Sequence, residues 1–127
     1  MQKLFIVRGV SGAGKTTFAE AICDIVVSAD DYFMQPDGSC QFDPKLLPKA
    51  HAYCQDNVRK HLSEGRSVAV ANTFTRQWEM QPYLNMAAQM GVMTFSTIVE
   101  NRHGGQNAHG VPDEVVQGMK DRFEIKL

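Results

Sequence analysis

The stretch Gly9-Val-Ser-Gly-Ala-Gly-Lys-Thr16 decides the fold, because it fits the pattern GxxxxGK(S/T) at every position. Glycines in such a loop adopt positive φ values and turn backbone N–H groups inward, toward phosphate oxygens. The lysine adds a positive charge for the β- and γ-phosphates, and the hydroxyl that follows ligates Mg²⁺. The sequence therefore predicts a phosphate-binding loop for ATP or another nucleoside triphosphate, with Lys15 and Thr16 in these two roles.

The residues expected to contact the nucleotide belong to this loop and to the start of the helix that should follow it. A helix N-terminus adds the positive end of its dipole to an anion site. The expected contacts are Gly9, Ser11, Gly12, Ala13, Gly14, Lys15, Thr16 and Thr17.

Strand and helix patterns alternate along the rest of the chain. Residues 3–7 read KLFIV, a short apolar run typical of a central parallel strand that is covered on both faces. We expect further strands at 25–27, 67–71 and 92–99, and helices at about 15–23, 48–64, 77–90 and from 112 onward. Because crossovers between parallel strands are right-handed, this alternation predicts an α/β fold with a parallel sheet flanked by helices.

The spacing of apolar residues predicts which helix side chains are buried. In the first helix these are Phe18, Ala19 and Ile22, and in the second Ala50, Cys54, Val58 and Leu62. In the third helix they are Tyr83, Met86, Ala87 and Met90, with Trp78 as a packing anchor, and in the last Val115, Met119 and Phe123.

The composition predicts one ordinary globular domain over residues 1–127, without a linker or repeat. Hydrophobic residues make up 43%, charged residues 21%, and the net charge is −1. The chain shows no basic stripe, so we expect any nucleic-acid contact to be limited to a strand end or a few phosphates. No apolar run is long enough to span a bilayer, and the N-terminus leads directly into the loop. Cysteines without metal-site spacing complete the expectation of a cytoplasmic protein.

Two neighbouring acids, Asp30 and Asp31, follow the expected second strand. Ligands of an open parallel sheet bind beyond the carboxyl ends of its strands, so the pair should face the γ-phosphate. One carboxylate could orient an attacking hydroxyl and take its proton, while the other could hold magnesium-bound water. The alternative is a structural role, as a helix cap and a solvated turn acid.

Residues 101–110 are rich in glycine and polar side chains and predict a lid that closes over phosphate. Arg102, Asn107 and His109 would be its hydrogen-bond donors. A plain surface loop is the alternative. A metal site at His103 and His109 is disfavoured, because no cysteine or carboxylate stands at ligand spacing. After the third strand, Asn72 and its neighbouring threonines could serve the site or cap the next helix.

Several of these stretches resemble the small polynucleotide-kinase-like P-loop proteins and the kinase domain of bacteriophage polynucleotide kinase. The resemblance rests on RGVSGAGKTTFA, SADDYF, NTFTRQWEMQPY and NAHGVPDEVVQGMKDRFE. It implies a three-layer P-loop NTPase fold with strand order 2-3-1-4 and a small lid. It further implies phosphoryl transfer from ATP, with Mg²⁺, to a hydroxyl acceptor such as the 5′-hydroxyl of a nucleic acid.

The resemblance also assigns roles to individual residues. Asp30 matches the general base, Asp31 its neighbour near the metal, and Arg102 stands for the lid arginines. The chain departs from the family where Phe33 stands near the place of an arginine and where Asn72 replaces an acid. These departures keep two alternatives open: a non-catalytic ATP-binding module and a simple NTPase. The acceptor and the oligomeric state also stay open.

Overall fold

The computed structural model describes residues 1–104 and 110–127, and over these residues it forms a four-stranded sheet in the order β2-β3-β1-β4. Every neighbouring pair of strands is parallel. The strands are β1 (Lys3–Arg8), β2 (Val26–Val27), β3 (Val68–Asn72) and β4 (Met93–Ile98). The predicted strand order 2-3-1-4 is confirmed.

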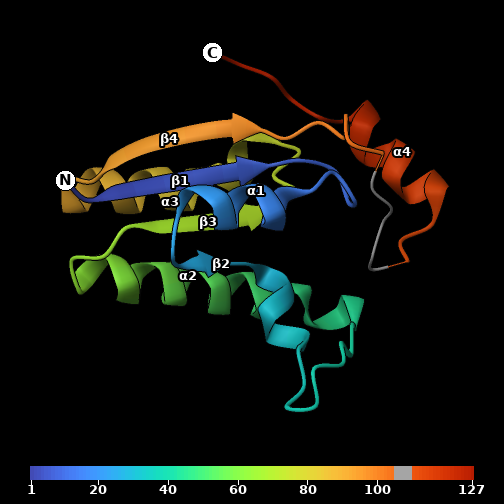
Figure 1. Ribbon diagram of the computed structural model, residues 1–127, viewed down its shortest axis with the longest axis horizontal. Helices are drawn as coiled ribbons and strands as arrows, with labels where there is room; N and C mark the ends of the chain where they lie inside the picture. Colours follow the sequence, from blue (N-terminus) through green and yellow to red (C-terminus); the bar gives the residue numbers. More distant parts are fainter. Residues whose placement is uncertain (105–109) are drawn as a thin grey trace.

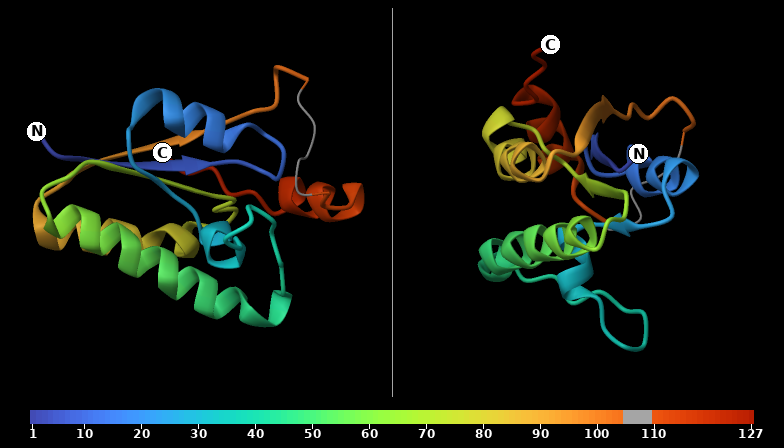
Figure 2. Two further views of the ribbon diagram at one scale, coloured as in Figure 1. Left: turned by 60° about the horizontal axis from the view of Figure 1, so that its bottom comes forward. Right: turned by 90° about the vertical axis from the view of Figure 1, so that its left-hand side faces the viewer.

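Helices cover both faces of this sheet, which gives the three layers expected from the sequence. The helices of the described chain are α1 (Lys15–Ile22), α2 (Leu47–Ser63), α3 (Gln77–Met90) and α4 (Asp113–Asp121), with short 3₁₀ helices η1 (Ala29–Phe33) and η2 (Pro44–Leu46). Figure 2 shows α1 on one face of the sheet and α2 and α3 on the other. The loops that follow the strands lie at one end of the sheet, the end where α4 also lies (Figure 1). This is the carboxyl end, where ligands of parallel sheets bind.

The larger core lies between the sheet and the pair α2 and α3. Strand residues such as Leu4 and Val70 are fully buried there. The stripe predicted for α2 is confirmed, since Ala50, Cys54, Val58 and Leu62 are all buried. At the C-terminus of α3, Gly91 adopts a φ of 67°, the left-handed conformation that ends a helix.

The core on the α1 face is smaller and corrects part of the prediction. Ala19 is buried as expected, but Phe18 and Ile22 each keep 39% of their surface exposed. Short alanine side chains of β3, Ala69 and Ala71, meet α1 on this face. Because the single helix α1 covers only part of the sheet, its outer apolar side chains stay half-exposed.

Other predicted buried side chains are also exposed. Trp78 exposes 72% of its surface, so the prediction of a packing anchor is wrong, and Met90 exposes 38%. The predicted stripe of α4 is wrong as well. Val115 is 44% exposed, and none of the described side chains of α4 is buried. Met119 and Phe123, the other members of the predicted stripe, are half-buried. The physical reason is position, because α4 lies beyond the end of the sheet rather than on one of its faces (Figure 1).

No helix among the described residues is long and apolar enough to cross a lipid bilayer.

Candidate active site

The loop predicted to bind phosphate follows β1 and ends in the first turn of α1. Gly14 is the N-cap of α1 and has a φ of 96°, a conformation that side chains other than glycine adopt only with strain. Gly9 has a different reason to be glycine. A Cβ atom there would lie 2.9 Å from the carbonyl oxygen of Val99. The turn therefore needs glycine at position 14 because of its positive φ, and at position 9 because another backbone segment approaches closely.

Lys15 lies across this loop. Its ammonium donates a hydrogen bond to the carbonyl oxygen of Val10 at 3.0 Å. Burial lowers the pKa of Lys15, and the negative charge of Asp30 opposes this by raising it. The ammonium of Lys15, which follows β1, is therefore sensitive to the charge of the acid that follows β2.

The hydroxyl residues of the loop differ in their surroundings. Thr16 and Thr17 are exposed at the start of α1. The Ser11 hydroxyl donates to the sulfur of Met119 at 3.7 Å, which places α4 against the loop. Ala13, between the glycines of the loop, is buried. Because Thr16 is exposed, its hydroxyl is accessible to a bound metal ion, as its predicted role requires.

The two acids after β2 have different local roles. Ser28 caps η1, because its hydroxyl accepts a hydrogen bond from the N–H of Asp30 at 3.2 Å. The Asp31 carboxylate accepts from the N–H of Ser28 at 3.0 Å, which completes a capping box. Burial raises the pKa of Asp31, the Ser28 hydrogen bond lowers it, and the charge of Asp30 raises it further. Both acids are exposed, but Asp31 shapes the turn, whereas the charge of Asp30 raises the pKa of Lys15.

Asn72, at the end of β3, holds this acidic turn in place. Its side chain is buried, and its carbonyl oxygen accepts from the N–H of Ala29 at 2.9 Å and from the Ser28 hydroxyl at 3.3 Å. Its amide also donates to the sulfur of Cys54 at 3.6 Å. The structure thus places Asn72 as a link between β3 and the turn. The sequence signal was a polar residue at the end of a buried strand, but the partner could not be read from it.

Sequence reasoning missed Arg8, the last residue of β1. Its guanidinium is buried and donates to the carbonyl oxygen of Phe74 at 3.0 and 2.9 Å and to that of Glu124 at 2.6 Å. It also stacks on the ring of Phe123, with 4.7 Å to the centroid. Phe74 has a φ of 44°, so Arg8 holds a strained residue next to the site. A charged residue at the end of an apolar strand was the available signal.

The segment after β4 reaches the phosphate-binding loop through two side chains. Nε2 of His103 lies 3.0 Å from the carbonyl oxygen of Ala13, and the Asn101 amide donates to the carbonyl oxygen of Gly12 at 3.4 Å. Arg102, the predicted catalytic residue between them, pairs with Glu100 at 2.6 Å in an exposed position. Its catalytic role stays a prediction. Asn107 and His109, also predicted from the lid, lie outside the described residues.

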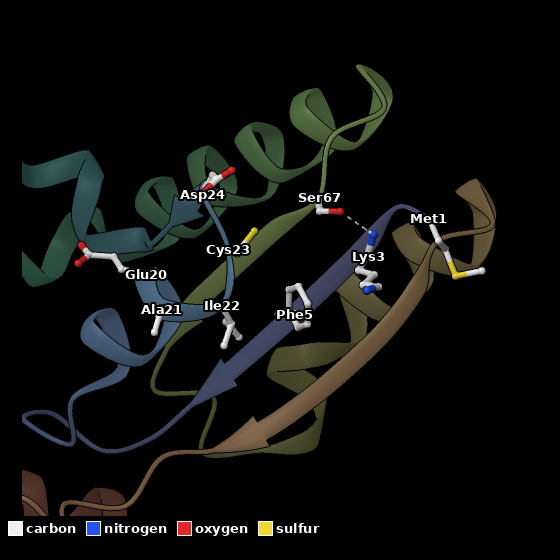
Figure 3. A pocket seen from close by; sticks show the side chains of 9 residues that line it. All are labelled: Met1, Lys3, Phe5, Glu20, Ala21, Ile22, Cys23, Asp24 and Ser67. Carbon is white, nitrogen blue, oxygen red and sulfur yellow. Dashed lines mark hydrogen bonds between the residues drawn. The ribbon is translucent and has the colours of Figure 1, made fainter.

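A hollow of about 320 Å³ lies at the opposite, amino end of the sheet. It is lined by residues from the start of β1, the end of α1 and the segment before β3, and Figure 3 shows Asp24 and Phe5 on its sides. The N–H of Lys3 donates there to the Ser67 hydroxyl at 2.9 Å. None of the lining residues belongs to the phosphate-binding loop, so the hollow is separate from the predicted site.

The residues at the carboxyl end fit a magnesium ion held jointly with a nucleotide. Within residues 1–104 and 110–127, no group of three or more histidines, cysteines or acids could hold a metal ion by itself. Mg²⁺ in nucleotide sites needs only one or two protein groups, because phosphates and water supply the other ligands. The exposed Thr16 hydroxyl and the carboxylates of the η1 turn are oxygen donors of this kind.

Comparison with known proteins places the chain among P-loop proteins. A family model described as "AAA domain" matches residues 4–125. Human NEDD4-binding protein 2 is 27% identical over 134 residues, which cover 95% of this chain and 8% of that protein. The chain thus spans only a small part of this relative.

Solved structures, kinases among them, share the fold. A chain of the Pnkp1/Rnl/Hen1 RNA repair complex matches with a TM-score of 0.69 and 17% identity, over 98% of this chain and 47% of that one. The APS kinase of Mycobacterium tuberculosis matches with a TM-score of 0.61 and 15% identity, over 98% of both chains. A gluconokinase from Sinorhizobium meliloti matches with 0.62 and 16%, over 97% of this chain and 75% of that one. The sequence-based resemblance to polynucleotide-kinase-like P-loop proteins is confirmed.

Proposed function

The chain belongs to the family described as the AAA domain, and we propose that it is an ATP-dependent kinase that transfers the γ-phosphoryl group to a hydroxyl acceptor. One observation carries this proposal. Lys15, which follows β1, and Asp30, which follows β2, lie at the same carboxyl edge of the parallel sheet, and the charge of Asp30 raises the pKa of the half-buried Lys15. A loop that only binds a nucleotide does not need an acid in that position.

The phosphate-binding loop and Lys15 would hold the triphosphate. N–H groups turned inward by the glycines bind phosphate oxygens, and the α1 dipole adds to the attraction. Lys15 would exchange its hydrogen bond with the Val10 carbonyl for phosphate oxygens, which keeps its charge satisfied in both states. Thr16 and Asp31 would hold Mg²⁺, which neutralises charge on the β- and γ-phosphates when bound.

Asp30 would serve the acceptor. Its carboxylate is exposed, so an incoming hydroxyl can reach it, and its N–H is fixed by the Ser28 cap. It would orient the hydroxyl and accept its proton as the new P–O bond forms and the bond to the leaving ADP breaks. A strong base is not required for this step, because phosphoryl transfer depends mostly on positioning and charge neutralisation. Arg102 would leave Glu100 to stabilise the transferred group.

We propose the 5′-hydroxyl of a nucleic acid as the first acceptor to test. The match to a chain of an RNA repair complex supports this choice. The net charge of −1 supports an acceptor bound at one end rather than along a duplex. The other candidate is a non-catalytic ATP-binding module. It is favoured by Asn72, which replaces an acid of the family at the end of β3. The side-chain carbonyl oxygen of Asn72 already accepts a hydrogen bond from the N–H of Ala29 in the turn.

The test is a transfer assay with γ-labelled ATP, Mg²⁺ and pooled acceptors: 5′-hydroxyl oligonucleotides, nucleosides and small hydroxyl metabolites. Asp30→Asn keeps the size of the side chain and removes its charge. At saturating ATP we expect transfer to fall about 10²- to 10⁴-fold, the usual contribution of a positioned acid–base group. ATP affinity should stay within a few-fold of the wild type.

Asp24→Asn is the matched control, because this exposed acid stands before β2 whereas Asp30 stands after it. It should leave transfer unchanged. No transfer by the wild type to any acceptor, with ATP still bound, would favour the binding module. A loss of transfer in Asp31→Asn but not in Asp30→Asn would exchange the two roles.

A further inference from the structure

The contact between His103 and the phosphate-binding loop has a definite chemical direction. Nε2 of His103 lies 3.0 Å from the carbonyl oxygen of Ala13. A carbonyl oxygen only accepts hydrogen bonds, so Nε2 must carry the proton and donate it. The ring also lies directly on Gly14, where an added Cβ atom would come within 2.7 Å of Nε2. The imidazole therefore contacts the Ala13–Gly14 peptide on the side of its carbonyl oxygen.

This contact fixes the direction of the N–H on the other side of the same peptide. The described chain contains no cis peptide bond, and in a trans peptide the C=O and N–H point in opposite directions. If His103 holds the Ala13 carbonyl outward, the N–H of Gly14 points inward, toward the place of the phosphates. Gly14 itself gives the peptide little resistance to rotation, because glycine accepts positive and negative φ almost equally.

The segment that carries His103 is itself anchored at two points before His103. At the end of β4, the N–H of Val99 donates to the carbonyl oxygen of Arg8 at 2.7 Å. Further on, Asn101 accepts from the N–H of Gly104 at 3.0 Å and donates to the carbonyl oxygen of Gly12 at 3.4 Å. His103 is thus held by backbone contacts next to the loop, rather than reaching it from a distant surface.

We propose that His103 is a positioning residue that orients the Ala13–Gly14 peptide for phosphate binding. The inference rests on the nucleotide-binding part of the proposed function. His103 does not touch the reacting atoms in this role. It lowers the cost of ordering the loop when ATP binds, and pre-ordering of this kind strengthens binding. A variant that loses this contact should therefore bind ATP more weakly and have a higher KM for ATP, while its kcat stays constant.

The test compares His103→Leu with His103→Gln. Leucine keeps bulk and loses the donor, whereas the amide nitrogen of glutamine can reach a position similar to that of Nε2. By calorimetry with ATP·Mg²⁺ we expect His103→Leu to weaken binding about three- to tenfold, the size of one net hydrogen bond. His103→Gln should stay within about twofold of the wild type. His61→Leu, on α2, is the control and should bind ATP as the wild type does.

The outcomes separate this inference from the proposed function. Wild-type affinity in His103→Leu would overturn the inference alone, and so would equal losses in the leucine and glutamine variants, because packing would then explain both. A lowered kcat at saturating ATP in His103→Gln would overturn it as well. Absence of ATP binding in the wild type would overturn both proposals. Transfer activity that fails while ATP binding follows the expected pattern would overturn only the kinase assignment.

Discussion

The two ends of the parallel sheet offer different kinds of candidate site. At the amino end, a hollow of about 320 Å³ lies beside β1. Its lining combines apolar residues such as Phe5 and Ile22 with charged ones, and the Lys3 N–H donates there to the hydroxyl of Ser67, which precedes β3. At the carboxyl end, groups from separate strands converge. Lys15 follows β1, Asp30 follows β2, and Asn72 ends β3.

The comparison teaches that strand direction points to the carboxyl end as the candidate site, whereas the hollow at the amino end lies away from the phosphate-binding loop. In a parallel sheet all carboxyl ends lie at one edge, so residues far apart in the sequence meet there. At that edge the pKa of Lys15 responds to the charge of Asp30, and Asn72 binds the turn that carries this acid. The hollow at the amino end is also lined by charged residues, Lys3, Glu20 and Asp24, but none of them follows a strand at its carboxyl end.

The largest expected difference between the two ends concerns lysine. Lys15→Ala should weaken ATP·Mg²⁺ binding about 10- to 100-fold, because a hydrogen bond to a charged group contributes about 1.5–3 kcal/mol. Lys3→Ala, at the amino end, should leave the affinity unchanged. Calorimetry and thermal protection by ATP measure both variants. Equal affinities in the two variants would show that the carboxyl end is not the nucleotide site.

The next largest effect concerns the link between β3 and the acidic turn. Asn72→Ala leaves the buried N–H of Ala29 without its partner, which should cost about 1–3 kcal/mol of unfolding free energy. Transfer should also fall, because Asp30 is then held less firmly. Urea denaturation measures the stability change, and Asn85→Ala, an exposed amide on α3, is the control. A variant as stable as the wild type would contradict the structural role of Asn72.

A smaller effect is expected at the amino end. Ser67→Ala removes the acceptor of the Lys3 N–H. Water can replace it in this half-buried position, so the loss should be about 0.5–1 kcal/mol. ATP affinity should not change. If calorimetry showed weaker ATP binding in this variant, the two ends would be coupled and the comparison would fail.

The smallest effect sharpens the distinction between the two acids of the turn. Because burial raises the pKa of Asp31, the folded protein disfavours its charged form. That cost is absent below the ordinary Asp pKa, near 3.9, and fully present above the raised value. Asp31→Asn keeps an acceptor for Ser28 and should stabilise the protein by up to about 0.5 kcal/mol at pH 7, since exposure screens the charge. At pH 3 the gain should vanish. Urea denaturation at both pH values measures this.

Sequence patterns predicted the elements well where periodicity is long and the partner face is apolar. The α2 stripe of Ala50, Cys54, Val58 and Leu62 is buried as expected, and α3 ends at Gly91. The same reasoning failed for Val115 and Trp78, because periodicity shows that a helix has an apolar face but not that anything covers it. It also missed Arg8, whose partners Phe74 and Glu124 are far away in the sequence.

The sequence by itself determined the phosphate-binding loop, the α/β alternation and the candidate acids, because each depends on residues that are close together in the chain. Only the tertiary structure decided which polar groups meet. In the folded chain, Asp31 accepts a hydrogen bond in the cap of η1, and Asn72 binds the N–H of Ala29 in the same turn. His103 contacts the carbonyl oxygen of Ala13, just before Gly14. The physical reason is that a hydrogen bond needs its partner within about 3 Å. Local sequence cannot specify this distance between residues that lie on different strands.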